Sequence, residues 1–214
     1  YRTFPPKYES KCIEYLKGFE SISVREKSAC KTVAESADKD VENVLDPTLL
    51  LSDLRWLDIA KKPRNLPHRY ILVYMMEGCK YTIEKARALA RDKECDLVLI
   101  NPTLRQRQTC KDFVMYKAAS PEEFVGMFAQ ADAVVTNSFH GVVFSVIFKK
   151  EFYAETSNAE KSARIVDLLA LFDLSDRILP NEINGKPNWE KVNSQLIKEK
   201  NKSISWLKDS LGLN

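Results

Sequence analysis

The chain has 214 residues, of which 44% are hydrophobic and 29% are charged, with a formal net charge of +3. This is enough for one sizeable core, and the interleaving of basic with acidic residues argues against a nucleic-acid partner. No run approaches the roughly 18 apolar residues that cross a bilayer, so we expect no membrane span. The five cysteines are scattered without a C-x-x-C pair, which favours reduced thiols in a cytosolic compartment over disulfides or zinc.

The predicted elements alternate between helix and strand from the start of the chain. In the first half we expect helices over residues 8–19, 27–36, 49–60 and 80–93, and strands over residues 21–26, 41–47, 69–76 and 96–101. The unbroken apolar run RYILVYMM within this half is typical of a central strand buried on both faces.

The same alternation continues to the end of the chain. Here we expect strands over residues 112–117, 132–137 and 151–156, and helices over residues 120–131, 138–150, 160–172 and 188–211. Ser120 as N-cap, with Pro121 at the first helical position, marks one helix start. The pattern indicates an α/β fold, a Rossmann-like parallel sheet with helices on both faces. We expect it to form one domain over residues 21–214, with a long C-terminal helix.

The most informative stretch is ADAVVTNSFHGVVFSVIFKKEF, residues 131–152. A strand followed by an apolar helix places residues 137–141 at the carboxyl edge of the sheet, where open α/β sheets bind ligands. We expect Asn137 or Ser138 to cap the helix. The backbone amides of Phe139, His140 and Gly141 then form an anion site, and the glycine lets a ligand approach the backbone closely.

His140 is one of only two histidines in the chain and stands beside this predicted anion site. A histidine side chain ordinarily titrates near neutral pH, so it could act there as a general acid or base. The same pattern fits a structural histidine that hydrogen-bonds a neighbouring loop, and the local sequence leaves both interpretations open.

Other candidates follow strands or open helices at the same predicted edge. Arg25 ends a strand and suits a carboxylate or phosphate, although a salt bridge with Glu26 would also explain it. Asp46, before a proline, could orient a cationic or imidazole partner or merely form a turn. Lys161 and Arg164 open a helix, where solvated cations are also common. The sequence has no G-x-G-x-x-G, P-loop, G-x-S-x-G or metal-ligand cluster, so we expect no cofactor and no metal.

The stretches SISVREKSA, VLDPTLLL, the segment around His140, and EKSARIVDLLALFDLSDRI follow one another in an informative order. In this order and at these distances, they resemble the C-terminal half of the polysaccharide pyruvyl transferase family, from about Glu14 onward. The resemblance implies the second of two facing Rossmann-like halves, as in the GT-B glycosyltransferase architecture. Residues 1–20 would then be a linking helix from a preceding N-terminal half.

The resemblance also implies an activity. The family moves an enolpyruvyl-derived group from phosphoenolpyruvate to sugar hydroxyls of a polysaccharide or glycan precursor, typically as a pyruvate ketal. The implied acceptor is a glycan or a lipid-linked sugar, and the implied location is the cytoplasm or the inner surface of the membrane.

The resemblance extends to the candidate residues. His140 would be catalytic, and the substrate would be bound by Arg25, Ser138, Phe139, Gly141, Lys161 and Arg164. Two positions depart from the family pattern. Ser138 stands where many members carry an arginine, for which Arg164 is the expected substitute, and Glu26 stands where many carry aspartate.

Two alternatives remain open at this point. The chain could be the C-terminal domain of a GT-B glycosyltransferase that binds a nucleotide-sugar, although the sequence has no clear acidic pair to hold a ribose. It could also be a non-catalytic domain of a glycan-assembly complex, in which His140 is structural.

Overall fold

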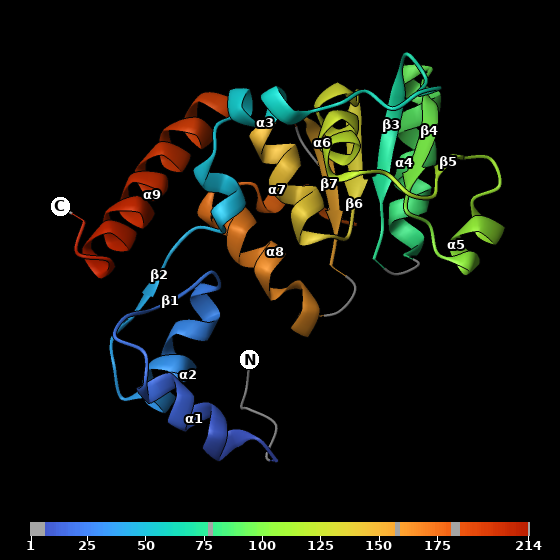
Figure 1. Ribbon diagram of the computed structural model, residues 1–214. Helices are drawn as coiled ribbons and strands as arrows, with labels where there is room; N and C mark the ends of the chain where they lie inside the picture. The colour runs from blue at the N-terminus through green and yellow to red at the C-terminus, as the bar shows by residue number, and fades with distance from the viewer. Residues whose placement is uncertain (1–6, 77–78, 157–158, 181–184, 214) are drawn as a thin grey trace.

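A parallel sheet forms the centre of the molecule (Figure 1). The computed structural model describes residues 7–76, 79–156, 159–180 and 185–213, and leaves out the side chains of residues 159–161. Within these residues, six strands pair in the order β5-β4-β3-β6-β7-β8, and every pair is parallel. In chain order they are β3 (Tyr70–Tyr74), β4 (Asp96–Ile100), β5 (Val114–Tyr116), β6 (Ala133–Thr136), β7 (Glu151–Glu155) and β8 (Ile178–Leu179).

Helices cover both faces of this sheet, as the sequence predicts. They are α4 (Lys80–Lys93), α5 (Leu104–Thr109), α6 (Pro121–Gln130), α7 (Phe139–Ile147) and α8 (Ala159–Leu171). Leu72 of β3 is fully buried in a core to which α6, α7 and α8 contribute. Its neighbour Ile71 is fully buried in a second core with α4 on the opposite face, as the two-residue period of a strand requires. Burial on both faces, at about 1.5–3 kcal/mol for each large side chain, stabilises the central strand.

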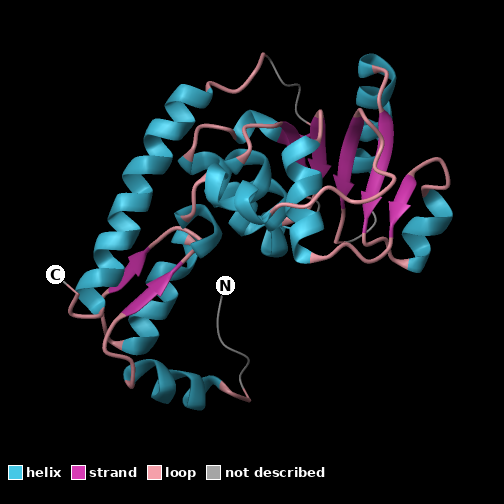
Figure 2. Ribbon diagram, turned by 45° about the horizontal axis from the view of Figure 1, so that its top comes forward, coloured by secondary structure: helices cyan, strands magenta, loops and turns pink. Residues whose placement is uncertain are grey.

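The first part of the chain forms a second, smaller sheet. It contains α1 (Glu9–Lys17), β1 (Ile22–Val24), α2 (Lys27–Ala37) and β2 (Val41–Asn43). The two strands pair in parallel with each other, and within the described residues neither joins the six-stranded sheet (Figure 2). The two strands therefore form a sheet of their own and do not extend the Rossmann-like sheet. The expected domain over residues 21–214, with a linking helix before it, stays a prediction.

A short crossover joins the two sheets. It holds the 3-10 helix η1 (Pro47–Leu50) and α3 (Asp53–Ile59), where Ser52 caps α3 by accepting a hydrogen bond from the Arg55 amide. The predicted helix over residues 49–60 thus begins only at Asp53. Asp46 is the N-cap of η1, so the crossover fixes its position between the two sheets.

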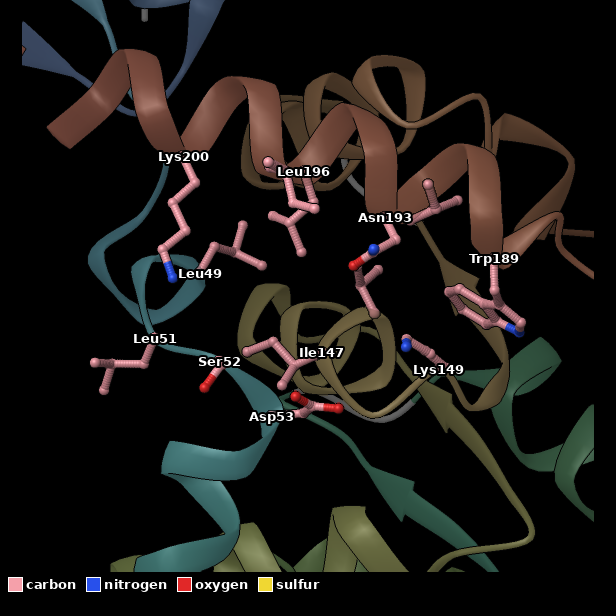
Figure 3. Close-up of a pocket in the computed structure, with 13 residues that line it drawn as sticks. Leu49, Leu51, Ser52, Asp53, Ile147, Lys149, Trp189, Asn193, Leu196 and Lys200 are labelled. Atoms are coloured by element: carbon pink, nitrogen blue, oxygen red, sulfur yellow. The ribbon is translucent and has the colours of Figure 1, made fainter. Parts of the chain in front are cut away.

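The long helix α9 (Trp189–Ser210) packs across this crossover. A pocket of about 250 Å³ lies between α9, η1 and the end of α7, lined by Leu49, Trp189 and Leu196 among others (Figure 3). Near its other end, α9 reaches the smaller sheet, where Lys202 pairs with Glu42 at 2.5 Å.

Every predicted helix and strand is present, most of them with ends moved by one to a few residues. The sequence did not predict α5, the 3-10 helices η1 and η2 (Ser175–Arg177) or the two-residue strand β8. Among the described residues, no helix combines the length and apolarity needed to cross a membrane.

Candidate functional site

The start of α7 lies directly after β6, at the carboxyl edge of the main sheet. Ser138 is the N-cap of α7, but its side chain makes no capping hydrogen bond. Instead, its amide donates to the Thr136 hydroxyl at 3.0 Å. The Asn137 side-chain oxygen accepts a hydrogen bond from the Met76 amide at 2.8 Å. Ser138 thus occupies the predicted N-cap position, but its side chain does not cap the helix. The Asn137 side chain is instead bonded to the segment that follows β3.

The first turn of α7 leaves backbone donors available. The first amides of a helix have no intrahelical acceptor, and no described residue accepts a hydrogen bond from those of Phe139, His140 or Gly141. Their orientation at a helix N-terminus favours a negatively charged group.

Gly141 has a packing role that the sequence did not predict. A Cβ atom at this position would lie 2.2 Å from the Thr136 hydroxyl oxygen, so the glycine allows close packing of helix on strand. The contact of its backbone with a substrate stays a prediction. Ser138 is only 5% exposed, which leaves little of it for a substrate to contact.

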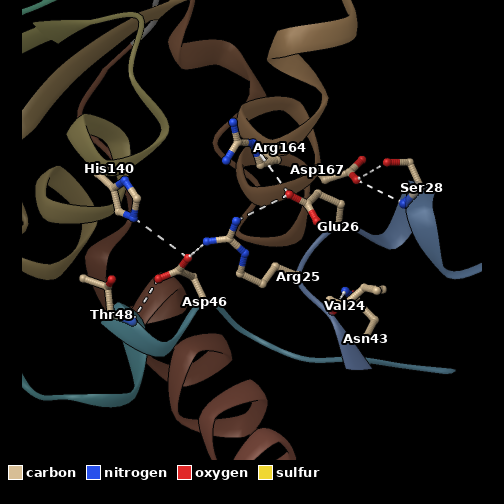
Figure 4. Close-up of polar contacts among 10 residues, drawn as sticks. All are labelled: Val24, Arg25, Glu26, Ser28, Asn43, Asp46, Thr48, His140, Arg164 and Asp167. Carbon is tan, nitrogen blue, oxygen red and sulfur yellow. Dashed lines mark hydrogen bonds and ion pairs between the residues drawn. The ribbon is translucent and has the colours of Figure 1, made fainter. Parts of the chain in front are cut away.

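His140 stands on the exposed side of the α7 start. Its side chain is 49% exposed, and its Nε2 lies 4.0 Å from Asp46 Oδ2 (Figure 4). The ring also meets the Phe139 ring edge-on, with 5.4 Å between the ring centres. A half-exposed imidazole beside a carboxylate is a suitable arrangement for moving protons.

Asp46 is held as a carboxylate by its surroundings. Its side chain is 3% exposed, and this burial raises its pKa. The hydrogen bonds from Thr48 and the pairing with Arg25 outweigh burial, so the pKa lies below its ordinary value. Oδ1 accepts from the Thr48 amide at 2.9 Å, while Oδ2 accepts from Arg25 Nη1.

Two arginines from distant parts of the chain converge on one aromatic ring. The guanidinium carbons of Arg25 and Arg164 lie 5.8 and 5.6 Å from the centre of the Phe139 ring. Glu26 joins them, with Oε1 3.9 Å from Arg25 Nη2 and 3.6 Å from Arg164 Nε. The carboxylate and the ring face thus keep two like charges close together.

A pocket of about 220 Å³ opens beside this group. Arg25, Asp46, Phe139 and Arg164 form part of its wall, and Leu168 adds apolar surface. Each arginine faces a carboxylate, so the pocket is less positive than the sequence analysis suggests. A salt bridge between Glu26 and Arg25 was one interpretation of the sequence and is present. The pairing of Glu26 with Arg164 was missed, because Arg164 is far away in the sequence.

The structure thus brings together His140, Phe139, Arg25 and Arg164 among the predicted site residues. Lys161 lies at the start of α8, but its side chain falls outside what the structure describes. Within the described residues, no group of three or more histidine, cysteine, aspartate or glutamate side chains could hold a metal ion.

The fold and this polar edge define an α/β protein with a candidate anion-binding site at the carboxyl end of a parallel sheet. The family model described as polysaccharide pyruvyl transferase matches residues 1–157. The chain belongs to the polysaccharide pyruvyl transferase family. The curated proteins contain no match.

Several solved structures are similar in fold. The UDP-GlcNAc 2-epimerase of Methanocaldococcus jannaschii aligns with 15% identity over 85% of this chain and 54% of its own, with a TM-score of 0.49. The wall teichoic acid polymerase TagF aligns with 13% identity over 96% and 55%, with a TM-score of 0.44. A mutant O-GlcNAc transferase of Thermobaculum terrenum aligns with 9% identity over 91% and 42%, with a TM-score of 0.43. The chain spans about half the length of these structures, and we take nothing about the site from them.

Proposed function

We propose that the protein transfers a pyruvyl group from phosphoenolpyruvate to sugar hydroxyls of a polysaccharide or glycan precursor and forms a pyruvate ketal. The observation that supports this best is a half-exposed His140 lying 4.0 Å from Asp46, a residue of the pocket wall to which Arg25, Phe139 and Arg164 also belong. Membership of the family makes a transferase acting on polysaccharides the starting point.

The donor carries a phosphate and a carboxylate, so it needs two positively polarised contacts. In our proposal the free amides at the start of α7 bind one group, and Arg25 with Arg164 binds the other. An incoming anion would replace the contacts that Glu26 and Asp46 now make with the guanidinium groups. Lys161, from its position at the start of α8, stays a predicted additional contact.

The chemistry needs two protons delivered, one to the donor methylene carbon and one to the departing phosphate, and two protons removed from the sugar hydroxyls. Protonation of the donor methylene carbon leaves an oxocarbenium-like centre at the neighbouring carbon. A sugar hydroxyl adds there and loses its proton, and the carbon–oxygen bond to phosphate breaks. A second hydroxyl then adds and loses its proton, which closes the ketal and leaves inorganic phosphate. His140 is our candidate for delivering the first proton and accepting a later one.

The acceptor side of the reaction is a further proposal. We propose a glycan or a lipid-linked sugar as acceptor, in the cytoplasm or at the inner surface of the membrane. In this proposal an N-terminal half of the same protein, which the family resemblance implies, helps to hold the acceptor.

Donor binding to the chain tests the proposal directly. Unfolding temperature and calorimetric heat are measured with phosphoenolpyruvate and, separately, with a nucleotide-sugar such as UDP-GlcNAc. We expect phosphoenolpyruvate to stabilise the fold, by about 2.7 kcal/mol at a hundredfold excess over Kd, and the nucleotide-sugar to have no effect. Stabilisation by the nucleotide-sugar alone would instead support a glycosyltransferase domain, and no response to either would favour a non-catalytic one.

A further inference from the structure

One carboxylate oxygen serves two partners in this site. Asp46 Oδ2 accepts from Arg25 Nη1 and also lies 4.0 Å from His140 Nε2 (Figure 4). The other oxygen, Oδ1, is fixed by the Thr48 amide at 2.9 Å. Since the side chain is 3% exposed and anchored in this way, the carboxylate cannot swing away from either partner.

At present Arg25 holds this oxygen. A separation of 4.0 Å is too long for a hydrogen bond to the imidazole, whereas Arg25 contacts the same oxygen directly. The guanidinium charge therefore cancels most of the influence of the carboxylate on the ring.

We propose that Asp46 is a positioning residue whose carboxylate exchanges Arg25 for His140 as its hydrogen-bond partner when an anionic donor binds to Arg25. The proposal rests on the function proposed above and adds a coupling between donor binding and the proton on His140. Asp46 has no predicted substrate contact, and its effect is exerted through the imidazole.

Arg25 is free to make the exchange. Its side chain is 37% exposed and lines the pocket, and its Nη2 already lies 3.9 Å from Glu26. An anion in the pocket gives the guanidinium a new partner and leaves Oδ2 unpaired. A buried carboxylate without a partner is costly, and a protonated imidazole at hydrogen-bonding distance would relieve that cost.

The exchange suits the proposed chemistry. A proton on His140 is useful only when the donor is in place, because the first step protonates the donor methylene carbon. With Nε2 toward Asp46, the ring delivers this proton from Nδ1. Donor binding thus supplies both the substrate and the acid form of the catalyst.

Few charged groups surround the ring. Among the described side chains, Asp46 faces it from the crossover, with Arg25 behind that carboxylate. Across the Phe139 ring lie Arg164 from α8 and Glu26, the N-cap of α2. Arg164 therefore offers a matched control, since it is a guanidinium of the same exposure over the same ring and, within the part of the chain that the structure describes, forms no ion pair with Asp46.

The first experiment needs no ligand. Ring-proton NMR signals of the full chain are followed at one fixed pH, where the wild-type His140 signal is intermediate, with His68 as the internal reference. We expect Arg25→Gln to raise the ratio of protonated to neutral His140 by about tenfold, the size typical of a newly available carboxylate. Arg164→Gln should change it far less. In an Asp46→Asn background, which retains an oxygen for the Thr48 amide, Arg25→Gln should have no effect.

Two results of this experiment would overturn the proposal. One is an equal response to Arg25→Gln and Arg164→Gln, which would indicate only a general loss of positive charge. The other is a response to Arg25→Gln that persists with Asp46→Asn. Unchanged His68 signals and circular dichroism establish that each variant is folded.

A second experiment adds phosphoenolpyruvate to the wild-type chain and to Asp46→Asn. We expect His140 to take up a proton on binding in the wild type and much less in the variant. Binding that leaves the His140 signal unchanged in the wild type would overturn the exchange while the donor assignment stands. Absence of binding would overturn the donor assignment, and the ligand-free comparison would still decide the role of Asp46.

Discussion

Thr136 and Gly141 lie so close together that any side chain at residue 141 would meet the threonine. A Cβ atom there would come within 2.2 Å of Oγ1 and 2.9 Å of the Thr136 Cβ. The Thr136 hydroxyl cannot move aside freely, because it donates to the Tyr74 carbonyl at 2.6 Å and accepts from the Ser138 amide at 3.0 Å. The first turn of α7, which carries His140, is thereby fixed to the end of β6.

Gly141→Ala should therefore destabilise the protein by about 1–3 kcal/mol, the usual cost of forcing a group into a packed site. The measurement is the free energy of unfolding in denaturant. Gly18→Ala is the matched control, because Gly18 has a φ of −75° and its added Cβ would meet only the Tyr15 carbonyl oxygen at 3.3 Å. Equal losses in the two variants would contradict the close packing at α7.

His140→Ala should lower the rate of pyruvyl transfer by roughly a hundred- to ten-thousand-fold, the usual contribution of an acid–base group. The unfolding temperature should change little, because the side chain is half exposed. The rate is measured as phosphate release in the presence of acceptor, with the whole protein. His68→Ala replaces the other histidine, in the loop before β3, and should keep the wild-type rate. A His140→Ala enzyme with near-normal turnover would remove this residue from the mechanism.

Arg25→Ala should mainly weaken donor binding. A hydrogen bond between charged groups contributes about 1.5–3 kcal/mol, so we expect the apparent KM for phosphoenolpyruvate to rise about ten- to a hundredfold. Arg87→Ala is the control, because that guanidinium pairs with Asp112 at 2.8 Å and lies outside the pocket wall. An unchanged donor KM in Arg25→Ala would count against the assignment.

Asp46 should make stability depend on pH. Its pKa in the folded protein lies below the ordinary value of 3.8, so the unfolded chain takes up the proton more readily. Its stabilising contribution is therefore complete above about pH 5 and is lost as the pH falls below about 4. The difference in unfolding free energy between the wild type and Asp46→Asn should shrink over that range.

The control for this pH dependence is Asp58→Asn. Asp58 pairs with Arg55 on the exposed surface of α3, and such pairs contribute little to stability. The unfolding free energy of this variant should follow the wild type at every pH. A constant gap between the wild type and Asp46→Asn across the whole range would show that the pKa of Asp46 is the same in the folded and the unfolded protein.

Local patterns were sufficient for most of the fold. The apolar run at β3 and the Ser120-Pro121 helix start each depend on neighbouring residues, and both are present as predicted. The helix α5 was missed although Thr103 and Gln106 form a capping box, a signal visible in the sequence. The division into two sheets carries no such signal, because a short strand has the same pattern whichever sheet it joins.

The site was predictable only in part, for a related reason. The edge rule for parallel strands placed His140 and Phe139 at the carboxyl end of β6. It says nothing about which carboxylates meet which arginines, since Glu26 at the start of α2 reaches Arg164 in α8, far away in the sequence. The packing of Gly141 on Thr136 was not predicted, because a glycine before a ligand and a glycine against a strand look identical in sequence.

The C-terminal helix α9 stabilises the backbone segment between β2 and η1, which carries Asp46. The Leu45 amide, immediately before Asp46, donates to Ser203 Oγ at 3.0 Å, from a residue 158 positions later in the sequence. The position of the Asp46 carboxylate, in the first quarter of the chain, thus depends on a residue close to the end of the chain. A C-terminal truncation within α9 would leave every candidate site residue in place and still release the backbone on which that carboxylate stands.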